Sequence, residues 1–170
     1  MEHLKQLPGK SIDSSFFDRE PLHVAKSLLG KIIAVRHSTS WLMARIIETE
    51  AYYRREKASH SSLGFTEKRR ALFMPPGTIY MYYARGGDSL NFSCRGEGNA
   101  VLIKSGYPIS LKGDGIDTLS IMQSNNPNRN GSRRSITKLC TGQTLLCKSL
   151  NLKVSEWDSK QLTPHSLELW

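Results

Sequence analysis

Two carboxylates stand at the end of an otherwise apolar segment, Ile46–Tyr53. If this segment is a β-strand, its side chains alternate between two faces, so Glu48, Glu50 and Tyr52 share one face with Ile46. Carboxylates two positions apart on a strand lie roughly 6.5–7 Å from each other. At that distance each negative charge raises the pKa of the other, and burial raises both further. One of the two glutamates is therefore expected to be a general base, although a solvated face of an edge strand fits the pattern about equally well.

A carboxylate several ångströms from the carbon under attack leaves room for a water molecule, which is the geometry of inverting glycosidic hydrolysis. The argument applies to N-glycosidic as well as O-glycosidic bonds. Near the glutamates is a set of aromatic side chains suited to stacking on flat bases and to bonding base edges through hydroxyls. The set comprises Tyr52, Tyr53, Tyr80, Tyr82 and Tyr83, with Phe73 nearby. For Tyr80 and Phe73, a place in the hydrophobic core is the alternative.

His60 is a lone histidine in a polar, serine-rich loop. Such a histidine is usually exposed, and the functional alternative is a donor to a substrate or to a backbone carbonyl. A metal site is not expected, since no second His or Cys stands at ligand spacing. The three cysteines are an odd number without a Cys-x-x-Cys pair, which argues against a disulfide framework. Cys140 and Cys147 are expected on the buried side of one helix.

The net charge of +9 and an isoelectric point near 9.6 favour an anionic partner, nucleic acid first and an acidic membrane second. Three basic loops, 54–57, 68–70 and 129–134, fit phosphate contacts, with Arg69 and Arg70 in the second. Basic loops are also common as solvated surface. No apolar run approaches the ~18 residues of a membrane helix, and the N-terminus lacks the apolar core of a signal peptide. With the cysteine usage, this predicts a cytoplasmic location.

The elements that position these groups follow from periodicity and from turn residues. A helix is expected over residues 14–30, with an inward face made of Phe17, Leu22, Ala25, Leu28 and Leu29. The alternating segments predict a hairpin of 31–37 with 41–50, and a three-strand meander of 78–83, 89–94 and 99–105. Shorter helices are expected near 66–73, over 114–125 and over 141–150, while the last twenty residues show no assignable element. The pattern is that of a single α+β domain over residues 1–170, with 1–13 loosely ordered.

Several short motifs also follow one another in a fixed order. They are Phe16-Phe17, Val24-Ala25, Leu28–Lys31, Arg45–Tyr52, Ala58-x-His60-Ser61, Phe73–Tyr82, Leu90-Asn91 and Gly96–Ile103. In this order they resemble the alkyladenine (3-methyladenine, hypoxanthine) DNA glycosylase family, as a short bacterial-type member. The resemblance runs from about residue 14 to 108 and resumes weakly near 139–151.

The resemblance implies a curved antiparallel β-sheet surrounded by helices, with a protruding β-hairpin that enters the DNA minor groove. It implies a monofunctional glycosylase that flips alkylated or deaminated purines out of duplex DNA and hydrolyses the N-glycosidic bond. It further implies no metal, no cofactor, no lyase step and no membrane partner. The expected partner is double-stranded DNA with damaged purines, bound by a monomer in the cytoplasm, at the nucleoid in a bacterium.

The resemblance also assigns roles to individual residues. Glu50 corresponds to the general base that activates water, and Lys104 stands where the family often has an arginine near that water. The base pocket is expected to be lined by Tyr52, His60, Tyr82 and Asn91, with Asn91 on its floor. An alkylated purine is cationic, so stacking on Tyr52 and Tyr82 adds a cation–π attraction.

The hairpin after Tyr82 departs from the family pattern. Where the family has Tyr-Gly, with the tyrosine wedged into the gap left by the flipped nucleotide, this chain has Tyr83-Ala84-Arg85 and is about one residue shorter. The wedge is therefore Arg85, Tyr83 or Ala84. The shortened hairpin leaves open a non-catalytic module that binds damaged DNA. The carboxylate pair and the charge leave open an RNA-directed or carbohydrate hydrolase.

Overall fold

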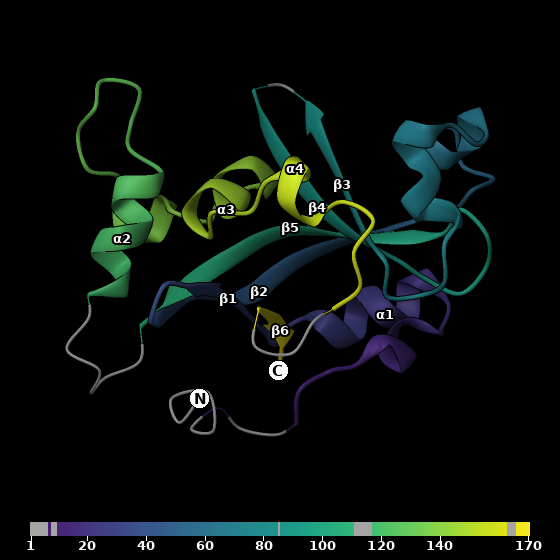
Figure 1. Cartoon of the computed structure of the whole chain (residues 1–170), viewed down its shortest axis with the longest axis horizontal. Helices are drawn as coiled ribbons and strands as arrows, with labels where there is room; N and C mark the ends of the chain where they lie inside the picture. Colours follow the sequence, from purple (N-terminus) through teal and green to yellow (C-terminus); the bar gives the residue numbers. More distant parts are fainter. Residues whose placement is uncertain (1–6, 8–9, 85, 111–116, 163–165) are drawn as a thin grey trace.

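The computed structural model describes residues 7, 10–84, 86–110, 117–162 and 166–170. Its centre is one curled antiparallel sheet of six strands in the order β3-β4-β5-β2-β1-β6 (Figure 1). The strands are β1 (Ile32–His37), β2 (Ser40–Tyr52), β3 (Ile79–Ala84), β4 (Gly87–Ser93), β5 (Ala100–Ile109) and β6 (Leu167–Leu169). The expected α+β class in a single mixed domain is confirmed. The expectation of loose order over 1–13 falls largely outside the described residues.

One large hydrophobic core joins the sheet to its helices. α1 (Pro21–Leu28) contacts β2 and β5, α3 (Gln143–Ser149) contacts β4 and β5, and α2 (Thr118–Asn125) contacts α3 and β2. Fully buried members of this core include Val24, Leu28, Ile46, Phe92, Ile103, Met122 and Leu146. Burial of apolar surface contributes about 25 cal/mol per Å², so this core holds β2, β4 and β5 in place, the strands that carry most of the site described below.

The helix expected over residues 14–30 is two elements, a 3-10 turn, η2 (Ser14–Phe17), and α1, which begins only at Pro21. Proline suits the first helical position because its φ is already helical and its missing N–H is not needed there. Phe17, Ala25 and Leu28 are buried, so this part of the expected inward face is confirmed. Leu22 and Leu29 are 44% and 49% exposed, so their predicted place in the core was wrong.

The hairpin and the three-strand meander are confirmed. β5 continues past its expected end at Ser105 because β2 is long enough to pair with it as far as Ile109. The short helix expected near 66–73 is a 3-10 helix, η4 (Glu67–Phe73), and another 3-10 turn, η3 (His60–Leu63), precedes it.

The C-terminal part contributes to both edges of the sheet. α4 (Val154–Trp157) packs on β3, and the Asp158 carboxylate after it accepts a hydrogen bond from the Met81 N–H at 2.8 Å. At the other edge β6 pairs with β1. Covered edges expose fewer unpaired backbone groups to other chains. None of the helices in the described ranges is long and apolar enough to cross a bilayer.

Cys94, Cys140 and Cys147 are buried and free. The expected common helix for Cys140 and Cys147 was wrong, because α3 begins only after Gly142, whose φ of 88° is not helical. The two helices expected in this part form as α2 and α3, both shorter than predicted. The first residues of the helix expected over 114–125 lie outside the described residues.

Candidate active site

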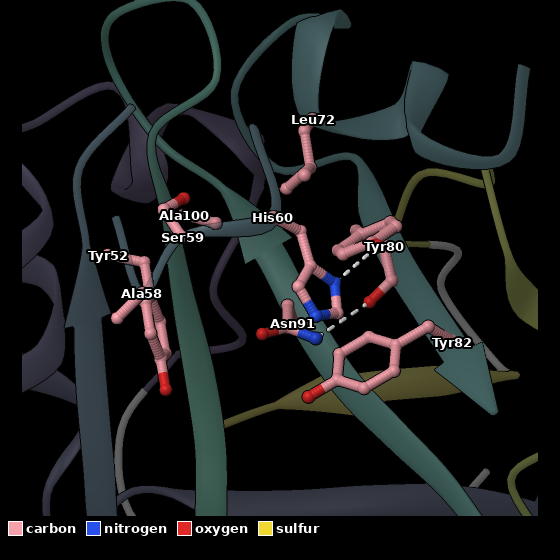
Figure 2. Close-up of a pocket in the computed structure, with 9 residues that line it drawn as sticks. All are labelled: Tyr52, Ala58, Ser59, His60, Leu72, Tyr80, Tyr82, Asn91 and Ala100. Carbon is pink, nitrogen blue, oxygen red and sulfur yellow. Dashed lines mark hydrogen bonds between the residues drawn. The ribbon is translucent and has the colours of Figure 1, made fainter. Parts of the chain in front are cut away.

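A pocket opens beside the C-terminal end of β2 (Figure 2). It is lined by Tyr52, Ala58, Ser59, His60, Leu72, Tyr80, Tyr82, Asn91 and Ala100. These residues come from β2, the loop at residues 58–59, the start of η3, η4, β3, β4 and the start of β5. All four residues that the family resemblance assigned to a base pocket are therefore brought together. Tyr80 serves both of its predicted roles, since it lines the pocket and is only 4% exposed.

The pocket has aromatic walls. Tyr52 stands on one side, and His60, Tyr80 and Tyr82 on the other (Figure 2). The ring centroids of His60 and Tyr82 are 4.5 Å apart, and those of Tyr80 and Tyr82 are 5.6 Å apart. β3 places Tyr80 and Tyr82 on the same face because they are two positions apart on a strand. A planar base that enters between the walls meets aromatic surface on both sides.

The His60 side of the pocket is held in a neutral state. Nδ1 of His60 is 2.9 Å from the Tyr80 hydroxyl. Burial lowers the pKa of His60, and the nearby Arg69 cation lowers it further. Burial raises the pKa of Tyr80 to about 12, helped by Tyr82 and Asp158. With both groups uncharged near pH 7, the wall does not repel a cationic purine.

Asn91 occupies a rigid position between these walls. It lies on β4, paired with Tyr80 of β3 and Leu102 of β5, and is 4% exposed. Its Nδ2 donates a hydrogen bond to the Tyr80 carbonyl at 3.2 Å (Figure 2). A side-chain amide fixed in this way presents a constant shape and polarity to any base edge in the pocket.

Glu50 precedes Tyr52 on β2, and both of its carboxylate oxygens have partners. Oε2 accepts a hydrogen bond from the Tyr52 hydroxyl at 2.6 Å, and Oε1 lies 3.0 Å from Nζ of Lys104 on β5. Burial raises the pKa of the Glu50 carboxyl, but the Tyr52 hydroxyl and the Lys104 cation outweigh it and hold this pKa below its usual value. Glu50 is therefore an anion near pH 7, with lone pairs left to accept a water proton. The sequence-based expectation of a raised pKa was wrong for Glu50, because its nearest charge is a cation.

Glu48 has a different environment from Glu50. The register between β2 and β5 shifts on both sides of Glu48, which marks a β-bulge. Ile46 is fully buried while Glu48 is exposed, and the register shifts between them, so the predicted common face of Ile46 and Glu48 was wrong. The Glu48 carboxylate instead accepts a hydrogen bond from the Ser105 hydroxyl at 2.5 Å. Its role in the structure is to hold β5, whereas Glu50 borders the pocket.

A comparison with known families places this geometry in context. The sequence profile of the methylpurine-DNA glycosylase (MPG) family matches residues 15–170. The chain belongs to the methylpurine-DNA glycosylase family. The expectation from the ordered motifs is confirmed at the level of the family.

Relatives of this methylpurine-DNA glycosylase family member occur in pseudomonads and in human. Proteins of Pseudomonas aeruginosa LESB58 and PAO1, provisionally named 3-methyladenine DNA glycosylase, are 58% identical over 159 residues, or 94% of this chain. A Pseudomonas fluorescens protein with the same name is 60% identical over 147 residues, or 86% of this chain. The human DNA-3-methyladenine glycosylase is 34% identical over 154 residues, covering 86% of this chain and 49% of its own length. The chain spans only 66% and 64% of the length of the P. aeruginosa and P. fluorescens relatives.

The described residues predicted to contact DNA lie on η4 and at the end of β3, two elements that also contribute to the pocket lining. Tyr83 at the end of β3 is 68% exposed, whereas Arg85 lies outside the described residues. Arg69 donates to the carbonyls of Leu63 and Gly64, and Arg70 donates to the Ser159 hydroxyl at 3.3 Å. Of the described wedge candidates, Tyr83 offers the large exposed ring that insertion into a base stack needs.

Two residues that support the site were not predicted from the sequence. The Ser105 hydroxyl accepts a hydrogen bond from the Gly142 N–H at 3.1 Å while it donates to Glu48. Gln143 donates from Nε2 to the Tyr82 hydroxyl at 3.4 Å and to Ser89 at 3.2 Å. Both tie the start of α3 to the strands of the pocket. No local pattern signals them, because each acts on a residue far away in the sequence.

The site offers no arrangement typical of a metal centre. Within the described ranges, no group of three or more His, Cys, Asp and Glu side chains is placed to hold an ion. His60 already shares a hydrogen bond with Tyr80, and Glu50 is engaged by Tyr52 and Lys104.

Proposed function

We propose that this chain is a monofunctional DNA glycosylase that flips alkylated or deaminated purines out of duplex DNA and hydrolyses the N-glycosidic bond. The observation that carries the proposal is the ionised Glu50 at the border of a neutral, aromatic-walled pocket. Membership of the methylpurine-DNA glycosylase family and the names of the relatives support it.

In the proposed reaction, the flipped purine lies between Tyr52 and the His60–Tyr82 wall. Glu50 accepts a proton from a water molecule, whose oxygen attacks the anomeric carbon of the sugar. The bond from that carbon to the purine nitrogen breaks, and its electron pair leaves with the base. A purine that carries a positive charge from alkylation departs as a neutral molecule without a further proton. The products are the free base and a sugar with a hydroxyl at the anomeric carbon.

Lys104 serves this reaction by positioning Glu50, the general base. Its Nζ, 3.0 Å from Oε1 of Glu50, is the cation of an ion pair. A protonated amine has no lone pair with which to attack the sugar, and an amine attack is what a lyase step requires. The same cation keeps Glu50 ionised and orients its carboxylate, which fits hydrolysis by water.

The decisive test compares Glu50→Gln with Glu48→Gln on methylated duplex DNA, with free bases separated by chromatography. General base catalysis contributes about 10²–10⁴-fold, so Glu50→Gln should lose base release by about that factor and retain DNA binding. Glu48→Gln is the matched control because it alters the same strand by the same chemistry and retains an acceptor for Ser105. Release by Glu50→Gln at the wild-type rate would show that the base is another group. Tight binding of damaged DNA without any release by the wild-type chain would favour the non-catalytic damaged-DNA-binding module.

A further inference from the structure

A second cleft lies away from the base pocket, between the turn of the β3–β4 hairpin and the loop that follows α2. Its lining comprises Gly86 from the hairpin, Asn125 from α2, Asn126, Pro127, Arg129 and Arg134 from the loop after it, and Thr144, Leu145 and Lys148 from α3. None of these lining residues is aromatic, so the cleft has no platform on which a base can stack. Its polar side chains are amides, a hydroxyl and cations, which suit phosphate oxygens.

The segment that supplies most of this cleft is basic. Residues 118–155 contain six cations and no aspartate or glutamate. The cations are Arg129, Arg133, Arg134, Lys138, Lys148 and Lys153. Among the described residues, the one ion pair that includes any of them joins Lys153 to Glu156 at 3.9 Å. The charge of Arg129 and Lys148, both exposed, is therefore available to an anion from outside the chain.

The loop that presents Arg129 is braced by its own hydrogen bonds. The Asn128 side chain donates to the Ser132 hydroxyl and to the Arg133 carbonyl. Arg134 donates from Nε to the Asn126 carbonyl at 3.1 Å and from Nη2 to the Pro127 carbonyl at 2.9 Å. A braced loop loses little conformational entropy when it binds a ligand. Arg134 thus shapes the cleft, while Arg129 and Lys148 face a ligand.

The position of the cleft points to the ligand. In Figure 1 the 126–134 loop and the η3–η4 segment project on the same side of the molecule as the β3–β4 hairpin, with the hairpin between them. The η4 segment, which carries Lys68, Arg69 and Arg70, therefore lies on the opposite side of the hairpin from the 126–134 loop, which carries Arg129. Two basic surfaces that flank one inserting hairpin match an extended polyanion better than a single small anion.

We propose that the cleft formed by Gly86, Arg129, Thr144 and Lys148 binds the phosphate backbone of duplex DNA on the side of the hairpin away from η4. This inference rests on the proposed function, since it extends the DNA-contacting surface around the same hairpin. Phosphate contacts fix the register of a protein on the duplex and are independent of base sequence. The cleft therefore holds the duplex while the base pocket examines it.

The test measures binding to undamaged duplex DNA over a series of salt concentrations, by fluorescence anisotropy. Each phosphate contact contributes about 0.9 to the slope of log affinity against log salt. The double variant Arg129→Gln/Lys148→Gln should therefore have a slope shallower than wild type by about 1.8. Both side chains are exposed and have no ion pair in the described residues, so the thermal midpoint should stay near that of wild type.

The control variant is Lys10→Gln/Lys26→Gln, which removes the same charge from the N-terminal segment and α1, on the other side of the molecule in Figure 1. Its slope should match that of wild type. Equal loss of slope in both double variants, or no loss in either, would overturn the proposal. Base release by the wild-type chain is measured separately. A shallower slope in the Arg129→Gln/Lys148→Gln variant alone supports the cleft even if no base is released, in which case the proposed function fails by itself.

Discussion

Tyr52→Phe isolates one hydrogen bond of the candidate active site. It removes the hydroxyl that donates to Oε2 of Glu50 at 2.6 Å and retains the ring that lines the pocket. Burial, and then the Glu50 charge, raise the pKa of the Tyr52 hydroxyl, so this group is a donor throughout the usual pH range. The variant therefore changes the electrostatics of Glu50 without removing the aromatic wall.

The expected loss of stability depends on pH. A hydrogen bond to a charged group contributes about 1.5–3 kcal/mol. The Glu50 side chain is 34% exposed, and competition from water reduces the expected value to about 1 kcal/mol. Because the folded pKa of Glu50 is depressed, this stabilisation is fully present above the pKa of an unfolded glutamate and is lost as the pH falls through the folded pKa. Tyr52→Phe should thus destabilise the fold at pH 7 and have little effect once Glu50 is protonated.

The same change should alter catalysis. Without the Tyr52 hydroxyl the pKa of Glu50 rises, so the acidic limb of the rate of base release moves to higher pH. If the proposed function holds, release of 3-methyladenine near pH 7 should stay close to wild type, because the ring and the Glu50 anion remain.

Two measurements check this reasoning, urea unfolding at a series of pH values and single-turnover base release over the same series. Tyr53→Phe is the matched control, since no hydrogen bond of the Tyr53 hydroxyl occurs among the described residues and its ring contacts Arg55 instead. A loss of stability that is the same at every pH, or an acidic limb that does not move, would refute the role assigned to the hydroxyl.

Three further variants test other parts of the site. Lys104→Met should move the acidic limb of base release to higher pH and cost no more than about 1 kcal/mol in urea unfolding, since the ion pair is about one-third exposed. An acidic limb that does not move would show that Lys104 does not lower the pKa of Glu50. Ser105→Ala leaves the Gly142 N–H and the Glu48 carboxylate without their partner, and should lower the free energy of unfolding by about 1–3 kcal/mol. Gly87→Ala places a Cβ 2.1 Å from Cγ2 of Thr144 and should cost about 1–3 kcal/mol in thermal unfolding; adding Thr144→Ser, which removes that methyl group, should recover part of the loss.

The pocket residues illustrate what a local pattern can predict. Glu50, Tyr52, Tyr80 and Tyr82 lie on strands whose alternation is visible in the sequence, and alternation decides which side chains share a face. The ordered motifs added His60 and Asn91 through their resemblance to a family. All of these except Glu50 line one pocket, and Glu50 borders it through Tyr52.

Local patterns could not predict the β-bulge or the charge state of Glu50. A bulge is a mismatch between two paired strands, so it exists only once β2 and β5 have met. The pKa of Glu50 is lowered in part by Lys104, which arrives from β5 as a consequence of the same pairing. A strand considered alone contains only the like charge of Glu48, which predicts the opposite shift.

By itself, the sequence determined the class of fold, the strands of the meander, the family and the residues that gather around the pocket, because these depend on local periodicity and on motif order. Only the tertiary structure decided that Glu50 is held as an anion, that Glu48 braces β5 through Ser105, and that Gln143 reaches Tyr82 across 61 positions. It also decided that the loop after α2 and the turn of the β3–β4 hairpin line one cleft. Each of these depends on a contact between distant segments, and the energy of such a contact is set by distance and burial rather than by neighbours in the chain.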